Sequence, residues 1–154
     1  MMKVFLAFWS IVLVTAFTTA SIVEDSADDT QSETFSREKR QACPTITFPC
    51  SRMPNVCANI RNAINLGKPT RLNRITNQIL IRVNRYFSGC RSLARIPGYN
   101  CDEYPFASTT QGGWGAVIRN VPIRENSIQG GLLGAFYRRY NIGNGCCFNV
   151  ALGP

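Results

Sequence analysis

The stretch "GYNCDEYPFASTTQGGWGAVIRNVPIRENSIQGGLLGAFY", residues 98–137, carries the clearest fold signals of this 154-residue chain. Within it, "WGAVIRNVP" (114–122) alternates apolar and polar residues and stops at Pro122, which predicts a β-strand. The part that follows, "ENSIQGGLLGAFYRRY" (125–140), has apolar residues at helical spacing. It predicts a helix with Asn126 as a suitable N-cap.

The segments at either end of the last 114 residues also carry strand and helix signals. "CPTITFPC" (43–50) indicates a short extended segment, and "CCFNVAL" (146–152) indicates a final strand. In "SRMPNVCANIRNAINLG" (51–67), Pro54 suits the first turn of a helix and Gly67 suits its C-terminal cap. The order of elements therefore predicts a mixed α+β fold.

The segment "KPTRLNRITNQILIRVNRYFSGC" (68–90) allows two interpretations. Its β-branched residues allow a strand followed by a helix, whereas its apolar residues also fit one helical face. Arginines lie among these apolar residues. They form either a simple solvated face or, for a minority of them, the lining of a groove for phosphates. The next segment, "RSLARIPGYNC" (91–101), contains a Pro-Gly step that indicates a loop. The apolar face would consist of Leu72, Ile75, Ile79, Val83, Tyr86 and Phe87, and the arginines are Arg71, Arg74, Arg82 and Arg85.

The first twenty residues have the pattern of a secretory signal peptide. A short basic start (1–3) precedes an apolar run (4–17), and the small residues Thr18 and Ala20 then suit signal peptidase. The run is short for a bilayer span, so cleavage after Ala20 is the preferred interpretation and a retained membrane anchor is the alternative.

Residues 21–40 form an acidic segment that ends in "REKR", a sequence typical of furin-like cleavage. The segment has six acids and few apolar residues, so it cannot bury enough surface to fold alone. We expect a propeptide that is removed after Arg40, which would expose Gln41 as a possible pyroglutamate. A solvated linker that stays attached is the alternative.

Removal of residues 1–40 would leave a strongly basic domain, 41–154. Four of the 17 basic residues and six of the nine acids lie in the removed part. The remaining 13 basic residues and three acids give a net charge of +10. Such a surface attracts polyanions such as nucleic acid, heparin-like glycans or anionic membranes.

The seven cysteines all lie in residues 41–154 and predict three disulfides with one cysteine left over. The chain has no histidine and no CxxC pair, which argues against a structural zinc site. Adjacent Cys146 and Cys147 are expected to reach different partners, and the odd cysteine could link two chains. The cysteines are Cys43, Cys50, Cys57, Cys90, Cys101, Cys146 and Cys147.

Three carboxylates remain in this basic domain, and they are its candidates for chemistry. Asp102, Glu103 and Glu125 could bind a hard cation or act on a water molecule. A surface turn with salt bridges to arginine is the simpler interpretation. If the acidic pair lies in a strand, its two side chains point to opposite faces and would not share one site. Without histidine, Ser-His and Cys-His nucleophile systems are excluded, and Tyr104 and Trp114 are expected in the core rather than as base-stacking platforms.

The longest motif of the chain resembles the deoxyribonuclease NucA/NucB domain, a family of secreted non-specific nucleases. The resemblance is carried by the order "GY", "DEYP", "GG", a strand, "EN" and "QGG", and it extends faintly over residues 51–150. These elements are Gly98-Tyr99, Asp102-Glu103-Tyr104-Pro105, Gly112-Gly113, the strand 117–121, Glu125-Asn126 and Gln129-Gly130.

The resemblance implies a metal-dependent endodeoxyribonuclease that uses an aspartate in place of the usual histidine base. It implies a small, disulfide-stabilised α+β domain with a strand–strand–helix core like that of metal nucleases. Asp102 would be the general base, Glu103 a ligand or supporting residue, and Asn126, with Glu125, would hold one Mg²⁺ or Mn²⁺ ion. We further expect Arg119, Arg124 and Gln129 to contact the phosphates of the substrate and to stabilise their charge.

One position departs from the family pattern, because Gln111 stands where members often carry an acid before Gly-Gly. If that acid is a metal ligand, this chain would bind metal weakly. We therefore expect a secreted enzyme that binds DNA without sequence preference and has no membrane attachment after signal removal. The alternative is a cationic secreted binding protein, such as a toxin, an antimicrobial or a matrix component, on the same fold without turnover.

Overall fold

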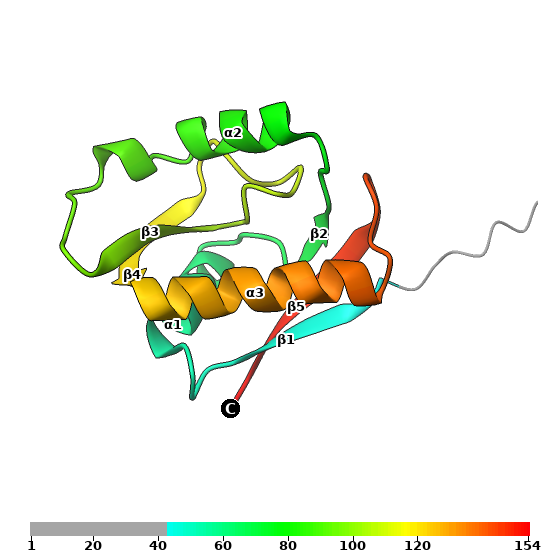
Figure 1. Cartoon of the computed structure of the whole chain (residues 1–154), viewed down its shortest axis with the longest axis horizontal. Coiled ribbons are helices and arrows are strands. Elements are labelled where there is room, and N and C mark those ends of the chain that lie inside the picture. Colours follow the sequence, from blue (N-terminus) through cyan, green and yellow to red (C-terminus); the bar gives the residue numbers. More distant parts are fainter. Residues whose placement is uncertain (1–42) are drawn as a thin grey trace, which may run out of the picture. The chain divides into compact units, whose positions relative to one another are not determined.

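Two small sheets and three helices make up the part of the chain that the computed structural model describes, residues 43–154 (Figure 1). The predicted signal peptide and propeptide, with their cleavage points at Ala20 and Arg40, lie outside the described residues. Residues 43–154 lie within one compact unit. None of the helices in the described residues is long and apolar enough to cross a membrane.

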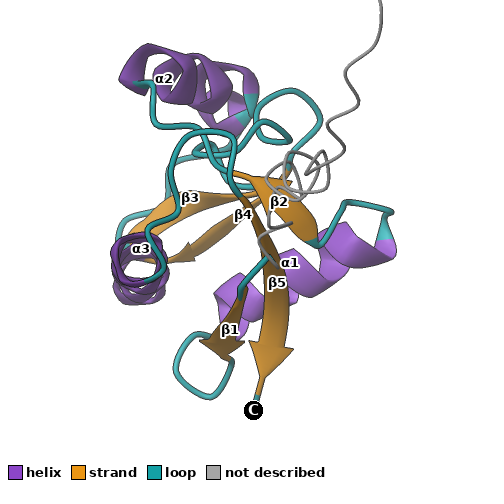
Figure 2. Cartoon of the chain, turned by 90° about the vertical axis from the view of Figure 1, so that its right-hand side faces the viewer, coloured by secondary structure: helices purple, strands orange, loops and turns teal. Residues whose placement is uncertain are grey.

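The larger sheet has the last strand of the chain at its centre. Strand β5 (Cys147–Gly153) pairs in parallel with β1 (Thr45–Pro49) and antiparallel with β2 (Arg71–Asn73). Figure 2 shows β1 and β5 side by side and running in the same direction. Phe48 and Phe148 alternate with more exposed residues along these strands and are fully buried. The two terminal strands predicted from the sequence are thus confirmed.

The second sheet is a hairpin that feeds directly into the longest helix. Strand β3 (Tyr99–Tyr104) pairs antiparallel with β4 (Val117–Pro122), and α3 (Ile123–Arg139) follows at once. This is the predicted strand–strand–helix core, and the α+β fold class is confirmed. The loop predicted for residues 91–101 ends earlier than expected, because β3 already begins at Tyr99.

Helix α3 begins at Ile123, two residues before the predicted helical segment 125–140. The N-cap is Pro122, and the backbone N–H of Ile123 donates to the carbonyl of Gly98 at 3.0 Å. Because the helix starts at the strand end, Asn126 lies inside its first turns and is not its N-cap. This shift leaves the Asn126 side chain free for another contact.

Helix α1 (Pro54–Asn65) begins at Pro54, as predicted. At its other end the N–H of Gly67 donates to Ile64 and that of Lys68 donates to Ala63, which is a Schellman motif. Gly67 takes φ +85°, a conformation that favours glycine. The predicted boundaries of this helix are therefore confirmed by its capping geometry.

The N-terminus of α1 is capped by a residue that is distant in sequence. Met53, at the N-cap position, supplies no side-chain hydrogen bond. Instead the Glu125 carboxylate accepts from the N–H of Asn55 at 2.7 Å, from the N–H of Val56 at 3.2 Å and from Asn55 Nδ2 at 2.7 Å. A carboxylate at this position satisfies otherwise unpaired N–H groups and interacts favourably with the helix dipole. Glu125 thereby ties the first turn of α3 to α1.

Segment 68–90 is a strand followed by a helix, the first of its two interpretations. Helix α2 (Gln78–Phe87) is capped by the side chain of Asn77. It packs on the domain through Ile81 and through Asn84, whose Nδ2 donates to the carbonyls of Ala107 and Thr109 at 2.9 and 3.0 Å. The predicted apolar face is divided by this arrangement. Leu72 and Ile75 are buried, whereas Ile79, Val83, Tyr86 and Phe87 are exposed.

Three disulfides are present, as predicted: Cys43–Cys147, Cys50–Cys57 and Cys90–Cys101. The second fastens the end of β1 to α1, and the third fastens the short 3-10 turn η1 (Cys90–Ser92) to β3. Cys146 is the free cysteine, so the expectation that both adjacent cysteines find disulfide partners is wrong for Cys146.

Substitution Glu125→Ala removes all three hydrogen bonds to the start of α1. We expect the free energy of unfolding to fall by about 2–3 kcal/mol, because a charged cap is lost and buried N–H groups stay unpaired. Urea unfolding followed by circular dichroism measures this. The neighbouring, exposed Arg124→Ala is the matched control and should change stability by less than about 0.5 kcal/mol. Equal stability of the Glu125 variant and the control would contradict the capping role.

Candidate active site

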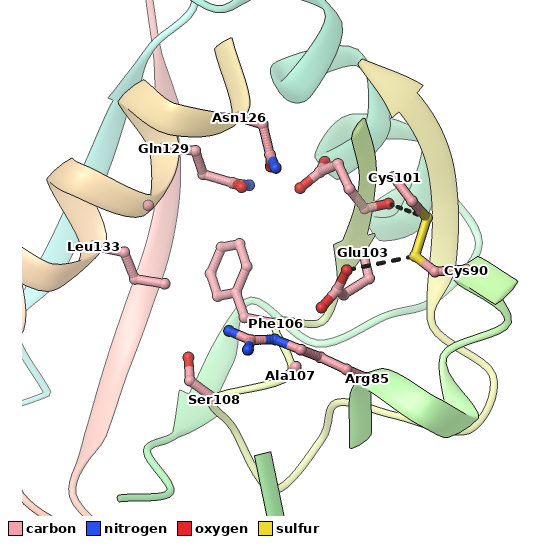
Figure 3. Close-up of a pocket in the computed structure, with 12 residues that line it drawn as sticks. Arg85, Cys90, Cys101, Glu103, Phe106, Ala107, Ser108, Asn126, Gln129 and Leu133 are labelled. Carbon is pink, nitrogen blue, oxygen red and sulfur yellow. Dashed lines mark hydrogen bonds between the residues drawn. A yellow bond between two sulfur atoms is a disulfide. The ribbon is translucent and has the colours of Figure 1, made fainter. Parts of the chain in front are cut away.

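A cavity of about 420 Å³ lies between β3, α3 and the end of α2 (Figure 3). Figure 3 shows the amides of Asn126 and Gln129 projecting from α3, with Glu103 across from them and Arg85 reaching in from α2. Apolar side chains complete the wall, so a few polar groups converge in a partly apolar pocket, as is typical of ligand sites. The lining residues are Arg85, Cys90, Cys101, Asp102, Glu103, Phe106, Ala107, Ser108, Asn126, Gln129, Gly130 and Leu133.

Asp102 is held in place by an asparagine of α1. Asp102 is 2% exposed, and its Oδ2 accepts from Asn59 Nδ2 at 2.9 Å. The same Nδ2 lies 3.3 Å from the carbonyl oxygens of Asp102 and Val117, which joins α1 to both strands of the hairpin. Asn59 is itself buried. The orientation of the Asp102 carboxylate is therefore fixed by a buried contact rather than by solvent.

Glu103 borders the same cavity as Asp102, although the two are neighbours on a strand. The expectation that an extended segment would separate them is therefore wrong. Among residues 43–154, strand β3 pairs only with β4, so its other edge is unpaired there, and side chains on both of its faces can border one space. The interpretation as a salt-bridged surface turn is also wrong, because Asp102 is buried and Glu103 is half-buried in a strand.

Burial raises the pKa of both carboxyl groups. The pKa of Asp102 rises to about 6 because of desolvation, which outweighs the stabilising hydrogen bond from Asn59. The pKa of Glu103 rises to about 7, first by desolvation and then by the nearby charge of Asp102, against the opposing effect of Arg85. Carboxyl groups that ionise near neutral pH are suited to accepting a proton from water.

Gln129 contributes an unsatisfied polar group to this cavity. It is 6% exposed, and its Nε2 has no hydrogen-bond partner within residues 43–154. Its amide nevertheless lies close enough to Asp102 to lower the pKa of that carboxyl group. A buried amide without a partner favours a ligand in the cavity.

The donor set fits a hard divalent cation. Two carboxylates and two amides border one cavity, and oxygen ligands of this kind suit Mg²⁺ or Mn²⁺. The sulfurs of Cys90 and Cys101 lie near Glu103, but they form a disulfide and offer no thiolate. The 3.6 Å approach of Cys90 Sγ to Glu103 Oε2 is therefore a packing contact.

Several residues predicted from the sequence lie outside the cavity. Glu125 does not border it, and both of its oxygens accept hydrogen bonds from α1, so it has a capping role in place of the expected ligand role. Arg119 stands opposite Asp102 on β4 and is exposed, as is Arg124. Any contact of these arginines with phosphate would lie outside the cavity.

Gln111 also lies away from the cavity. Its Oε1 accepts from the N–H of Asn73 at 3.0 Å, and its Nε2 donates to Asn73 Oδ1 at 3.0 Å. This reciprocal pair fastens the loop after β3 to β2. The departure from the family pattern therefore does not remove a carboxylate from the cavity wall.

Two site residues were missed or left unspecified by sequence reasoning. Asn59 had a visible signal, because it is a polar residue at helical spacing from Val56 and Ala63 on the buried face of α1. Arg85 was only one of four candidate arginines, and its place at the cavity depends on how α2 docks. The expectation of a core role is confirmed for Tyr104, which is fully buried, and wrong for Trp114, which is 85% exposed.

Comparison with known proteins identifies the family. Residues 56–151 match the deoxyribonuclease NucA/NucB family, and the chain belongs to it. A DNA-entry nuclease of Bacillus subtilis (strain 168) is 28% identical over 148 residues, which cover 91% of each chain. The family that the sequence motif resembled is thus confirmed.

The raised pKa values predict how stability depends on pH. Between about pH 4 and pH 7 the folded carboxyl groups hold protons that the unfolded chain has lost, so the metal-free protein should gain stability as pH falls through this window. Urea midpoints measured at several pH values in EDTA check this. The double variant Asp102→Asn, Glu103→Gln should show a flatter profile and higher stability at neutral pH. A wild-type profile that rises with pH over this range would contradict the burial of these charges.

Proposed function

We propose that the chain is a metal-dependent deoxyribonuclease that hydrolyses phosphodiester bonds in the cavity beside β3 and α3. The observation that carries this proposal is the buried Asp102, held by Asn59 at the cavity wall with its pKa raised to about 6. Membership of a deoxyribonuclease family and similarity to a DNA-entry nuclease of Bacillus subtilis support DNA as the substrate.

Asp102 would act as the general base. Water attacks the phosphorus atom, and its proton passes to the Asp102 carboxylate as the bond to the leaving sugar oxygen breaks. The leaving oxygen takes a proton from solvent. Asn59 keeps the carboxylate oriented for this transfer, and the apolar wall formed by Phe106 and Leu133 limits access of bulk water.

Asn126, Gln129 and Glu103 would bind and orient the reacting groups. Asn126 and Glu103 offer oxygen ligands for Mg²⁺ or Mn²⁺, which when bound neutralises developing charge on the phosphate. The unpaired Nε2 of Gln129 can donate to a phosphate oxygen. The Arg85 guanidinium brings positive charge to the same wall and would attract the phosphate before reaction.

The charge and the cysteines support a secreted protein that binds DNA without sequence preference. The described residues expose many arginines, while their three carboxylates are buried or half-buried. Contact with the DNA backbone would therefore be electrostatic and weakened by salt. Three disulfides are typical of proteins that leave the reducing cytosol. The disulfide-linked dimer through Cys146 stays a prediction.

The direct test is digestion of supercoiled plasmid by the oxidised protein with Mg²⁺ or Mn²⁺. We expect nicking that EDTA abolishes, and a loss of roughly 10²–10⁴-fold in rate for Asp102→Asn, the usual contribution of general base catalysis. Asn100→Ala is the matched control, because Asn100 is exposed on the same strand and does not border the cavity.

Gel-shift measurements separate binding from hydrolysis. Asp102→Asn removes a negative charge and should bind DNA at least as well as the wild type, so a slower rate is not a loss of affinity. A wild-type protein that shifts DNA but nicks it with neither metal would contradict the enzymatic proposal and favour the cationic binding protein.

A further inference from the structure

Helix α2 presents its apolar side chains to solvent. On the side that faces the domain, its apolar contacts are limited to a small cluster of Ile75, Ile81 and Ala107. Both views of the chain show α2 apart from the other two helices (Figures 1 and 2). Five large apolar residues of α2 are exposed, and we call them the α2 crest: Ile79 (69%), Leu80 (49%), Val83 (42%), Tyr86 (55%) and Phe87 (49%).

The α2 crest is a continuous stripe, because residues 79, 83 and 86 follow helical spacing. A surface helix of a globular protein normally turns such a stripe towards the core. Here Asn84 occupies the inward side and is fastened to the backbone of the loop after β3. Contiguous apolar patches that stay exposed typically mark an interaction surface.

The segment that contains the α2 crest and the turn after it carries only positive charges. Residues 78–98 contain no acid, and Arg82, Arg91 and Arg95 are exposed among them. The guanidinium of Arg91 lies over the Tyr86 ring, 4.5 Å from its centroid. A partner for this surface therefore needs both apolar groups and negative charge.

Trp114 is an exposed aromatic residue in the loop that packs against α2. It is 85% exposed and follows Gly113, which lies so close to α2 that an added Cβ would come within 2.8 Å of Asn84 Oδ1. Tryptophan and tyrosine prefer the boundary between lipid and water, where one part of the ring is apolar and the other is polar.

In place of the expectation of no membrane attachment, we propose that the α2 crest binds the surface of an anionic lipid membrane, with α2 lying in the plane of the interface. A bilayer offers acyl chains to the aliphatic residues and anionic head groups to the arginines that flank them. Nucleic acid would pair with the arginines but would leave Ile79, Leu80 and Val83 without an apolar partner. A second copy of this chain would bring two surfaces of like charge together.

The α2 crest is separate from the candidate active site. None of its five residues lines the cavity, and α2 reaches the cavity through Arg85 instead. Substitutions in the crest therefore leave the proposed catalytic groups in place. Because the crest residues are exposed, the fold should tolerate polar replacements.

The test is sedimentation with vesicles of phosphatidylcholine, with and without phosphatidylserine, at low and high salt. All variants are recovered from the same producing cells with the same N-terminus. The double variant Ile79→Ser, Val83→Ser should bind phosphatidylserine vesicles roughly tenfold or more weakly than the wild type, because two apolar contacts are lost. Leu66→Ser is the matched control, since Leu66 is also exposed, at 65%, but lies at the end of α1.

Binding that requires phosphatidylserine, falls with salt and is lost in the crest variant but not in the control supports the proposal. Absence of vesicle binding, or equal binding by the crest variant, overturns it. If vesicles are not bound, two further results identify the other occupant. A crest variant that loses affinity for DNA would assign the crest to nucleic acid. A wild type that self-associates through the crest in sedimentation velocity would assign it to a second copy of the chain.

Discussion

The Glu125 carboxylate at the N-terminus of α1 is the contact on which the candidate active site depends. Burying a charge is unfavourable unless hydrogen bonds compensate, and here three donors of α1 supply them. The contact joins the first turn of α3 to α1. Helix α1 in turn carries Asn59, which binds Asp102 on the hairpin. One buried acid thus keeps the three elements of the site in register.

The cavity wall is held by these contacts, and it contains two carboxyl groups that are unfavourable to ionise. Desolvation is the largest cause of the raised pKa of both Asp102 and Glu103, and the charge of Asp102 raises the pKa of Glu103 further. Apolar residues in place of such a pair would often make the fold more stable. The electrostatic cost of these groups is expected at a site that binds a cation and a phosphate. The cation would oppose the charge of the carboxylates, and the phosphate would pair with Arg85 and Gln129.

Sequence reasoning succeeded where the signal is local. Pro54 and Gly67 marked the ends of α1, and the alternation before Pro122 marked β4. It failed where contacts join distant residues: Asn59 and Asp102 are 43 residues apart, and Asn55 and Glu125 are 70 apart. Periodicity contains no information on such pairs, so it could not predict the capping role of Glu125, for which the family resemblance implied a ligand role instead. Periodicity also placed the apolar residues of segment 68–90 on one helical face, because spacing shows that apolar residues share a face but not which face meets the core.

The central claim is that Asp102 is a buried base whose ionisation is tuned by Asn59. The most direct measurement is a nuclear magnetic resonance titration of the side-chain carboxyl carbons in metal-free protein, assigned with Asp102→Asn. The account predicts a pKa of about 6 for Asp102, and a higher pKa in Asn59→Ala because a hydrogen bond to the ionised form is lost. An Asp102 that titrates at the ordinary value near 3.8, unchanged by the Asn59 substitution, would contradict it.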